Sequence, residues 1–144
     1  MTSSRQSREH LITIENKLPA ITSVIDQLEA FGSEIGIDVG AIQRFSIVLD
    51  ELLNNTISYG FEEGEEAEIQ IRMMWTPPEF EITIEDEGRH FDPIGSGQPD
   101  ISADIDERDI GGLGIHIIKN IMDEFHYRRL GVRNIISVRK RLLP

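Results

Sequence analysis

Three short segments of this 144-residue chain carry side chains whose types and spacing could do chemistry. Glu51 and Asn55 lie four residues apart, Asp86 precedes Gly88 by two, and a glycine-rich segment, Gly111–Gly114, follows an acidic stretch. In that order they could supply a proton acceptor, a metal ligand, a carboxylate that reads a nucleobase and a cradle for phosphate. Each segment alone is a weak signal, but their combination makes a nucleotide site the leading hypothesis.

Glu51 and Asn55 fit a pair on one face of a helix, one turn apart. A carboxylate there can accept a proton from water or a hydroxyl. An amide oxygen one turn on can take one position of an octahedral magnesium, whose other ligands are phosphate oxygens and water. The same spacing also fits a solvated polar helix face, and it does not choose between Asn54 and Asn55 as the ligand.

Asp86 follows a strand in which Phe80, Ile82 and Ile84 alternate, so the next inward position is this carboxylate. A buried ionised carboxylate is costly unless it is hydrogen-bonded, and the amino group of a nucleobase would satisfy it. Gly88 lacks a Cβ, which would let a flat ring approach the backbone. An ordinary Asp-x-Gly turn at the end of a strand fits the residues equally well.

The glycine-rich segment opens a predicted helix, where free amides of Gly112, Leu113 and Gly114 could bind phosphate. It is neither a P-loop nor a Rossmann fingerprint, and a flexible hinge is the alternative. Residues 92–111 show no periodicity and are predicted to form a lid. Arg108 within it could swing over phosphates and supply positive charge, or could pair with acidic neighbours.

The elements around these motifs predict an α+β fold, a two-layer sandwich whose mostly antiparallel mixed sheet is covered on one face by helices. Residues 1–9 are expected to be a disordered tail and 10–144 a single domain. The first half of the chain is expected to contain a strand within 10–15, a helix from Pro19 toward Gly32, and a second helix that Asp38 caps and Gly60 stops. A hairpin of strands 69–75 and 80–84 follows, with its turn at Pro77-Pro78. After the lid we expect a helix with Ile117, Ile118, Ile121 and Met122 facing inward, and then two strands near 124–130 and 133–140.

Composition excludes several kinds of partner and chemistry. The net charge of −12 repels phosphate backbones and anionic membranes, so direct nucleic-acid or membrane binding is not expected. The absence of cysteine excludes thiol catalysis and disulfides. The N-terminus lacks the apolar core of a signal peptide, and no apolar run is long enough to cross a bilayer, so a cytoplasmic location is expected.

The motifs as a set resemble the GHKL ATPase superfamily, shared by gyrase, heat-shock chaperones, sensor histidine kinases and mismatch-repair proteins. Within it, the chain looks like the stand-alone anti-sigma-factor serine/threonine kinases of bacteria. The resemblance covers roughly residues 10–142. It is carried by three stretches: Asp50–Gly60, Glu85–Pro93 and Gly111–Arg129.

The resemblance implies a role for each matching residue. Glu51 would be the general base and Asn55 the Mg²⁺ ligand. Asp86 would read adenine, with Gly88 beside the base. The phosphates of ATP would lie at Gly112 and Gly114. This chain departs from the family pattern at two positions, with His90 where a second glycine is frequent and Tyr59 where many relatives have histidine.

The implied activity is an ATP-dependent serine/threonine protein kinase. Its substrate would be a small anti-anti-sigma-type protein, and release of that protein would free the kinase to sequester a sigma factor or an analogous regulator. A homodimer could form through the first helix or the basic C-terminal strands. The alternatives are a partner-binding switch gated by ATP without catalysis, and a detached ATPase domain of a histidine kinase.

Overall fold

A computed structural model describes residues 6–96 and 112–142 of the chain. In chain order, its elements are β1 (Arg8–Glu15), the 3-10 turn η2 (Leu18–Ala20), α1 (Ile21–Ile35), α2 (Val39–Gly60), β2 (Glu68–Thr76), β3 (Glu79–Asp86), α3 (Pro93–Ser96), α5 (Gly112–Ile121), β4 (Glu124–Leu130) and β5 (Arg133–Arg141).

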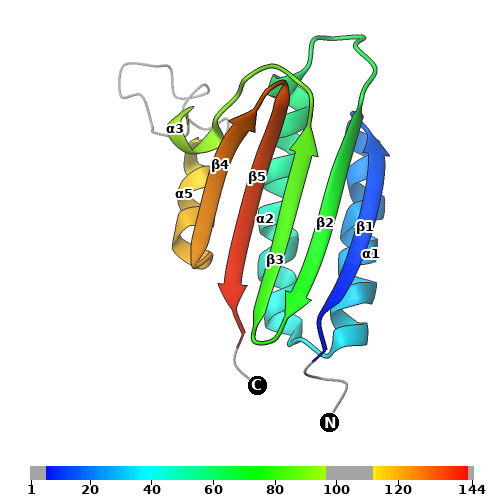
Figure 1. Cartoon of the computed structure of the whole chain (residues 1–144), viewed down its shortest axis with the longest axis vertical. Helices are drawn as coiled ribbons and strands as arrows, with labels where there is room; N and C mark the ends of the chain where they lie inside the picture. The colour runs from blue at the N-terminus through cyan, green and yellow to red at the C-terminus, as the bar shows by residue number, and fades with distance from the viewer. Residues whose placement is uncertain (1–5, 97–111, 143–144) are drawn as a thin grey trace.

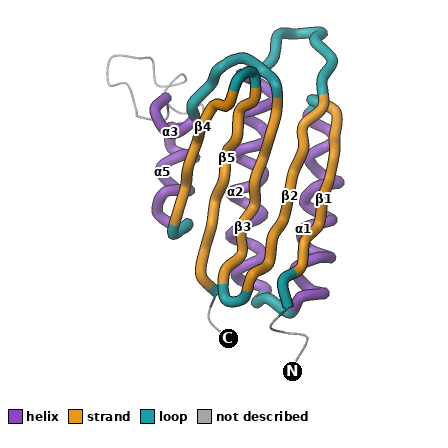
Figure 2. The backbone as a smooth tube through the Cα atoms, in the orientation of Figure 1, coloured by secondary structure: helices purple, strands orange, loops and turns teal. Residues whose placement is uncertain are grey.

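The strands form one sheet in the order β1-β2-β3-β5-β4. Every neighbouring pair of these described strands is antiparallel. Helices α1, α2 and α5 all lie behind the sheet in Figure 1, and the tube in Figure 2 shows the same two layers. The predicted two-layer α+β sandwich is confirmed.

The core lies between the two layers and follows from the alternation of the strands. The even-numbered residues of β3 from Phe80 to Asp86 are buried, while the odd-numbered ones are partly exposed. The rings of Phe45 on α2 and Phe80 on β3 meet edge to face, with centroids 4.8 Å apart. Burying such a side chain contributes about 1.5–3 kcal/mol, so these contacts hold α2 against the strand that ends in Asp86.

Helix α2 begins as predicted, because the side chain of Asp38 accepts a hydrogen bond from the Gly40 amide at 3.0 Å. The predicted end of α1 near Gly32 is wrong, since α1 continues to Ile35 and stops at Gly36 with a φ of 82°. A Cβ on Gly32 would lie 2.8 Å from Ile42 Cδ1, so this glycine permits close packing of α1 on α2.

Two further boundary predictions need correction. Strand β1 begins at Arg8, which pairs with Trp75, so Arg8 and Glu9 belong to the sheet and not to the predicted tail of residues 1–9. Residues 1–5 lie outside the described part of the chain. The predicted lid, 92–111, contains a short helix at its start. Pro93 is its first residue, and Asp92 Oδ1 accepts a hydrogen bond from the Ile94 amide at 2.9 Å. Residues 97–111, with Arg108, lie outside the described part.

The helix after the lid forms where expected, but one predicted inward residue is wrong. Ile117 is 49% exposed, and Ile115 is buried in its place at 2%. Ile118 and Met122 face the core as predicted, and Ile121 packs against its margin. Gly114 lies one turn before Ile118 on the same helix face, and the space of its missing Cβ is taken by the side chain of Glu51 on α2.

Candidate functional site

Asp86 ends strand β3 and is only 5% exposed, which confirms its predicted inward direction. Its Oδ1 atom accepts hydrogen bonds from the Gly88 amide at 2.8 Å and from Asn134 Nδ2 at 3.0 Å. Within the described part of the chain, no donor forms a hydrogen bond with Oδ2. A buried carboxylate oxygen without a donor is costly, so this atom fits a ligand that brings an N–H group.

The charge state of Asp86 reflects burial and its partners. Burial raises the pKa of this carboxyl above its ordinary value, although the hydrogen bonds from Asn134 and Gly88 and the nearby Arg129 charge act in the opposite direction. Arg129 Nη1 donates to the Gly88 carbonyl at 3.1 Å and to Asn134 Oδ1 at 3.0 Å. The Arg129 guanidinium thus holds the Gly88 carbonyl and the Asn134 side chain in place next to Asp86. It forms no ion pair with Asp86 in the described part of the chain.

Gly88 has a packing role in addition to the role beside the base that the sequence predicts. A Cβ built on it would lie 2.5 Å from the carbonyl oxygen of Gly60, at the end of α2. The same carbonyl accepts a hydrogen bond from the Arg89 amide at 2.9 Å. The missing side chain therefore makes room for the end of α2 to approach the loop after β3, and that space holds protein backbone.

Glu51 and Gly114 come together although they lie on different helices. A Cβ built on Gly114 would lie 2.3 Å from Glu51 Cδ and 2.6 Å from each carboxylate oxygen. The side chain of Glu51 is half-buried, and it rests against the first turn of α5. The first four amides of a helix have no partner within it, so this carboxylate lies beside a helix start that can accept phosphate.

Asn55 is 6% exposed, and its side-chain amide has no hydrogen-bond partner among the described residues. Asn54, by contrast, donates to the Asp50 carbonyl at 2.8 Å and lies on the outer side of α2. An unsatisfied buried amide next to Glu51 fits a ligand atom better than a solvated helix face does. The described residues contain no group of three or more His, Asp or Glu that could hold a metal ion alone. A cation there would therefore need phosphate oxygens or water as further ligands.

Gly112 and Leu113 are the first two residues of α5. Their backbone starts the helix as the motif predicts. Gly111 and Arg108 lie outside the described residues. Glu51 thus meets Gly114 where α2 packs on α5, and the loop after Asp86 contacts the C-terminal end of α2 through the Arg89 amide and the Gly60 carbonyl.

Asn134 is a site residue that sequence reasoning missed. It is 3% exposed and lies directly opposite Asp86 in the β3–β5 register. The sequence of its own strand contains an indication of this. Asn134 alternates with Ile136 and Val138 on the inward face of β5, and a polar residue among buried apolar ones is unusual. The adjacency of β3 and β5 is what turns this signal into a contact with Asp86.

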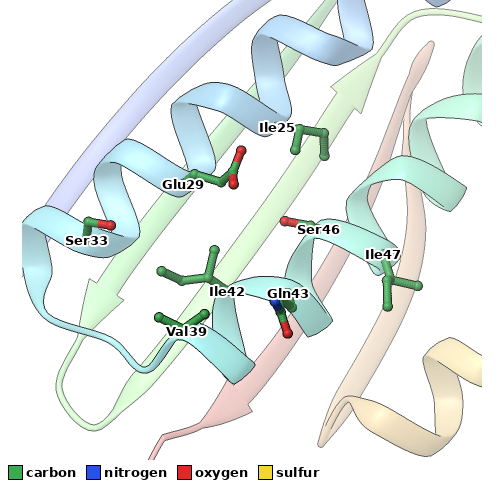
Figure 3. Close-up of a pocket in the computed structure, with 8 residues that line it drawn as sticks. All are labelled: Ile25, Glu29, Ser33, Val39, Ile42, Gln43, Ser46 and Ile47. Carbon is green, nitrogen blue, oxygen red and sulfur yellow. The ribbon is translucent and has the colours of Figure 1, made fainter.

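Two hollows in the described part of the chain differ in their relation to this cluster. One, of about 360 Å³, is lined by Asp86 itself, with Arg133 beside it. Its lining also includes four glutamates, whose charges would repel a nucleotide's phosphates (Glu66, Glu68, Glu85 and Glu87). The other, of about 560 Å³, lies between α1 and α2, where Ile25, Ile42 and Ile47 line it (Figure 3). It is a groove in the helical layer and does not reach Asp86.

Residues 14–140 of this chain match the family described as "Histidine kinase-like ATPase domain". The chain belongs to this family. The superfamily expected from the three motifs is therefore confirmed. No helix in the described part of the chain has the length and apolar character needed to cross a membrane.

Similar proteins carry kinase names. The serine/threonine-protein kinase BtrW of Bordetella bronchiseptica is 29% identical over 103 residues, or 70% of this chain and 72% of that protein. The serine-protein kinase RsbW of Bacillus subtilis is 28% identical over 120 residues, or 77% and 74% of the two chains. The alignment with RsbW of Listeria monocytogenes, at 28% identity, covers 67% of this chain and 64% of that protein.

Solved structures show the same fold. The RsbU and RsbW domains of a Mycobacterium tuberculosis protein superpose with a TM-score of 0.66 at 15% identity, over 95% of this chain and 33% of that one. A blue-light activated histidine kinase of Erythrobacter litoralis gives a TM-score of 0.57 at 18% identity, over 87% and 40%. This chain therefore spans about a third to two fifths of those longer proteins.

Proposed function

We propose that this chain is an ATP-dependent serine/threonine protein kinase that also acts as an anti-sigma-type regulator. The observation that carries the proposal is the buried Asp86 carboxylate, whose Oδ2 has no donor among the described residues. The family match and the kinase names of the relatives support it.

Each group of site residues would bind a different part of ATP. Asp86 would accept a hydrogen bond from the adenine amino group, with the loop at Gly88 alongside. The amides of Gly112, Leu113 and Gly114 would hold the phosphates at the start of α5. Arg108, from the lid, would add positive charge over them. The side-chain oxygen of Asn55 would hold Mg²⁺ together with phosphate oxygens.

Bound ATP with Mg²⁺ supplies the phosphoryl group and neutralises its charge, and the protein supplies position and proton transfer. Glu51 is the general base of this proposal, because its carboxylate rests beside the first turn of α5 where the phosphates would lie. It would accept the proton of the partner's serine hydroxyl as that oxygen attacks the γ-phosphorus of ATP, while the bond from that phosphorus to the departing ADP breaks. Holding the two reactants in line contributes the larger share of the rate.

The partners follow from the resemblance, and the names of the relatives support the kinase activity alone. The substrate is a small anti-anti-sigma-type protein, which leaves once it carries phosphate. The freed kinase then binds a sigma factor or an analogous regulator. If bound ATP changes the affinity of the kinase for a partner by some factor, that partner must change the affinity of the kinase for ATP by the same factor. A homodimer, a cytoplasmic location and the absence of nucleic-acid binding remain part of the proposal.

Phosphotransfer from labelled ATP to a serine of the anti-anti-sigma-type partner tests the activity, with Glu51→Ala as the decisive variant. We expect Glu51→Ala to lose transfer by at least about 10²-fold while binding ATP as the wild type does. Transfer at the wild-type rate by Glu51→Ala would remove Glu51 as the base. ATP binding without transfer by the wild type would favour the non-catalytic switch, and transfer to histidine would favour the histidine-kinase alternative.

A further inference from the structure

The side chain of Asn134 is enclosed by five polar groups. Its Nδ2 atom donates to Asp86 Oδ1 at 3.0 Å, to the Arg89 carbonyl at 2.9 Å and, more weakly, to the Gly88 carbonyl at 3.3 Å. Its Oδ1 atom accepts from the Tyr127 hydroxyl at 2.7 Å and from Arg129 Nη1 at 3.0 Å. Both ends of the amide are therefore satisfied inside the protein, which leaves this residue no role as a direct ligand.

The chemistry of these partners determines which way the amide points. A guanidinium such as Arg129 can only donate, and the carbonyls of Gly88 and Arg89 can only accept. A flipped amide would set its NH₂ group against Arg129 and its oxygen against two carbonyls and the carboxylate of Asp86. The observed orientation is thus set by contacts on both sides of Asn134.

The orientation of Asn134 in turn sets that of Asp86. Oδ1 receives two donors, from Asn134 and Gly88, so the carboxylate cannot rotate without breaking both hydrogen bonds. Oδ2 remains without a donor among the described residues and is held in one direction as an acceptor. A purine with a 6-amino group satisfies that acceptor, whereas a 6-oxo group would place one acceptor against another.

We propose that Asn134 is a specificity-determining positioning residue, which holds Asp86 so that the site accepts 6-amino purine nucleotides and rejects 6-oxo purine nucleotides. This inference rests on the proposed nucleotide site and extends it to a residue on another strand. Asn134 also bonds the carbonyls of Gly88 and Arg89, so it holds the carboxylate and the loop beside it in one arrangement.

Titration calorimetry with Mg-ATP and Mg-GTP on the full chain tests the proposal, with urea unfolding of the nucleotide-free protein measured in parallel. The variants are Asn134→Ala, which removes the donor, and Asn134→Thr, which keeps one short donor and suits a strand. Tyr127→Phe is the matched control, because it removes one hydrogen bond of Asn134 while Arg129 still orients the amide.

In the wild type we expect ATP to bind at least about 100-fold more tightly than GTP, because a site built on a hydrogen bond rejects analogues that cannot form it. Asn134→Ala should reduce that ratio about tenfold or more, whereas Asn134→Thr and Tyr127→Phe should stay within about threefold of the wild-type ratio. Should Asn134→Ala not fold, Asn134→Leu replaces it, because leucine has the same branching of side-chain heavy atoms as asparagine and fills the space without a donor to Asp86.

The outcomes separate this inference from the proposed function. An unchanged ATP-to-GTP ratio in Asn134→Ala or Asn134→Leu, with only lower stability in urea, overturns the role of Asn134 and leaves the ATP site intact. A ratio that falls as far in Tyr127→Phe also overturns it, because general loosening of the network would then explain the effect. A wild type that binds neither nucleotide overturns the proposed function, and the inference with it.

Discussion

Replacing Gly88 by alanine tests whether the absence of a side chain at this position is needed for stable packing of the fold. In Gly88→Ala the new Cβ would lie 2.5 Å from the Gly60 carbonyl oxygen, 2.9 Å from Asp86 Oδ1 and 3.1 Å from Phe61 Cε1. The carbonyl cannot rotate aside, because it belongs to the end of α2 and already accepts the Arg89 amide. Either that hydrogen bond breaks or the end of the helix moves.

Overpacking of this kind costs about 1–3 kcal/mol of unfolding free energy. For a chain of this length, that loss lowers the melting temperature by roughly 3–12 °C. Urea unfolding of the nucleotide-free protein measures it directly, with the fluorescence of the single tryptophan, Trp75, as the signal.

Gly60→Ala is the matched control, since a Cβ there meets no other atom within 4 Å. Alanine is the better helix former, so this variant should equal the wild type or exceed it by up to about 1 kcal/mol. The reasoning is refuted if Gly88→Ala unfolds at the wild-type urea concentration and loses only its response to nucleotide. The glycine would then serve the ligand, as the sequence alone suggests.

Two further predictions concern the carboxylates. In Gly114→Ala, the Cβ at 2.3 Å from Glu51 Cδ displaces a flexible carboxylate, so stability should change little while phosphotransfer falls about 10²-fold; an unaltered rate in the transfer assay would contradict this. Burial raises the pKa of Asp86, so the folded state binds its proton more tightly than the unfolded state does, and ionisation lowers stability as pH rises through that interval. Asp86→Asn should therefore unfold at higher urea than the wild type at pH 7, with the gap closing below about pH 4, and a less stable variant at pH 7 would count against the reasoning.

Local patterns predicted the parts of the fold that depend on neighbouring residues. The alternation of Phe80, Ile82 and Ile84 placed Asp86 in the interior, and Asp38 marked the start of α2. The length of α1 was underestimated because a glycine inside a helix resembles a stop until the packing of Ile42 against Gly32 is known. The inward face of α5 was misassigned at Ile117, since a short helix after a glycine run has no sequence marker for its phase.

The site was only partly predictable for a related reason. Glu51, Asn55 and Asp86 carry local patterns that indicate chemistry, whereas the role of Asn134 depends on β5 lying beside β3. Asp86 and Asn134 are 48 residues apart in the sequence, and only the order of the strands in the sheet brings the Asn134 amide to the carboxylate. The packing of Gly88 against the Gly60 carbonyl is equally non-local, and it gives that glycine a role in the fold that its local sequence does not indicate.

Nucleotide-dependent thermal unfolding tests the central claim most directly. We expect Mg-ATP at 100 times its Kd to stabilise the wild type by about 2.7 kcal/mol, by mass action, and Mg-GTP at the same concentration to have a much smaller effect. Asp86→Ala should remove the ATP response while the protein still unfolds cooperatively. Equal shifts with ATP and GTP, or an undiminished ATP shift in Asp86→Ala, would contradict the reading of adenine by this carboxylate.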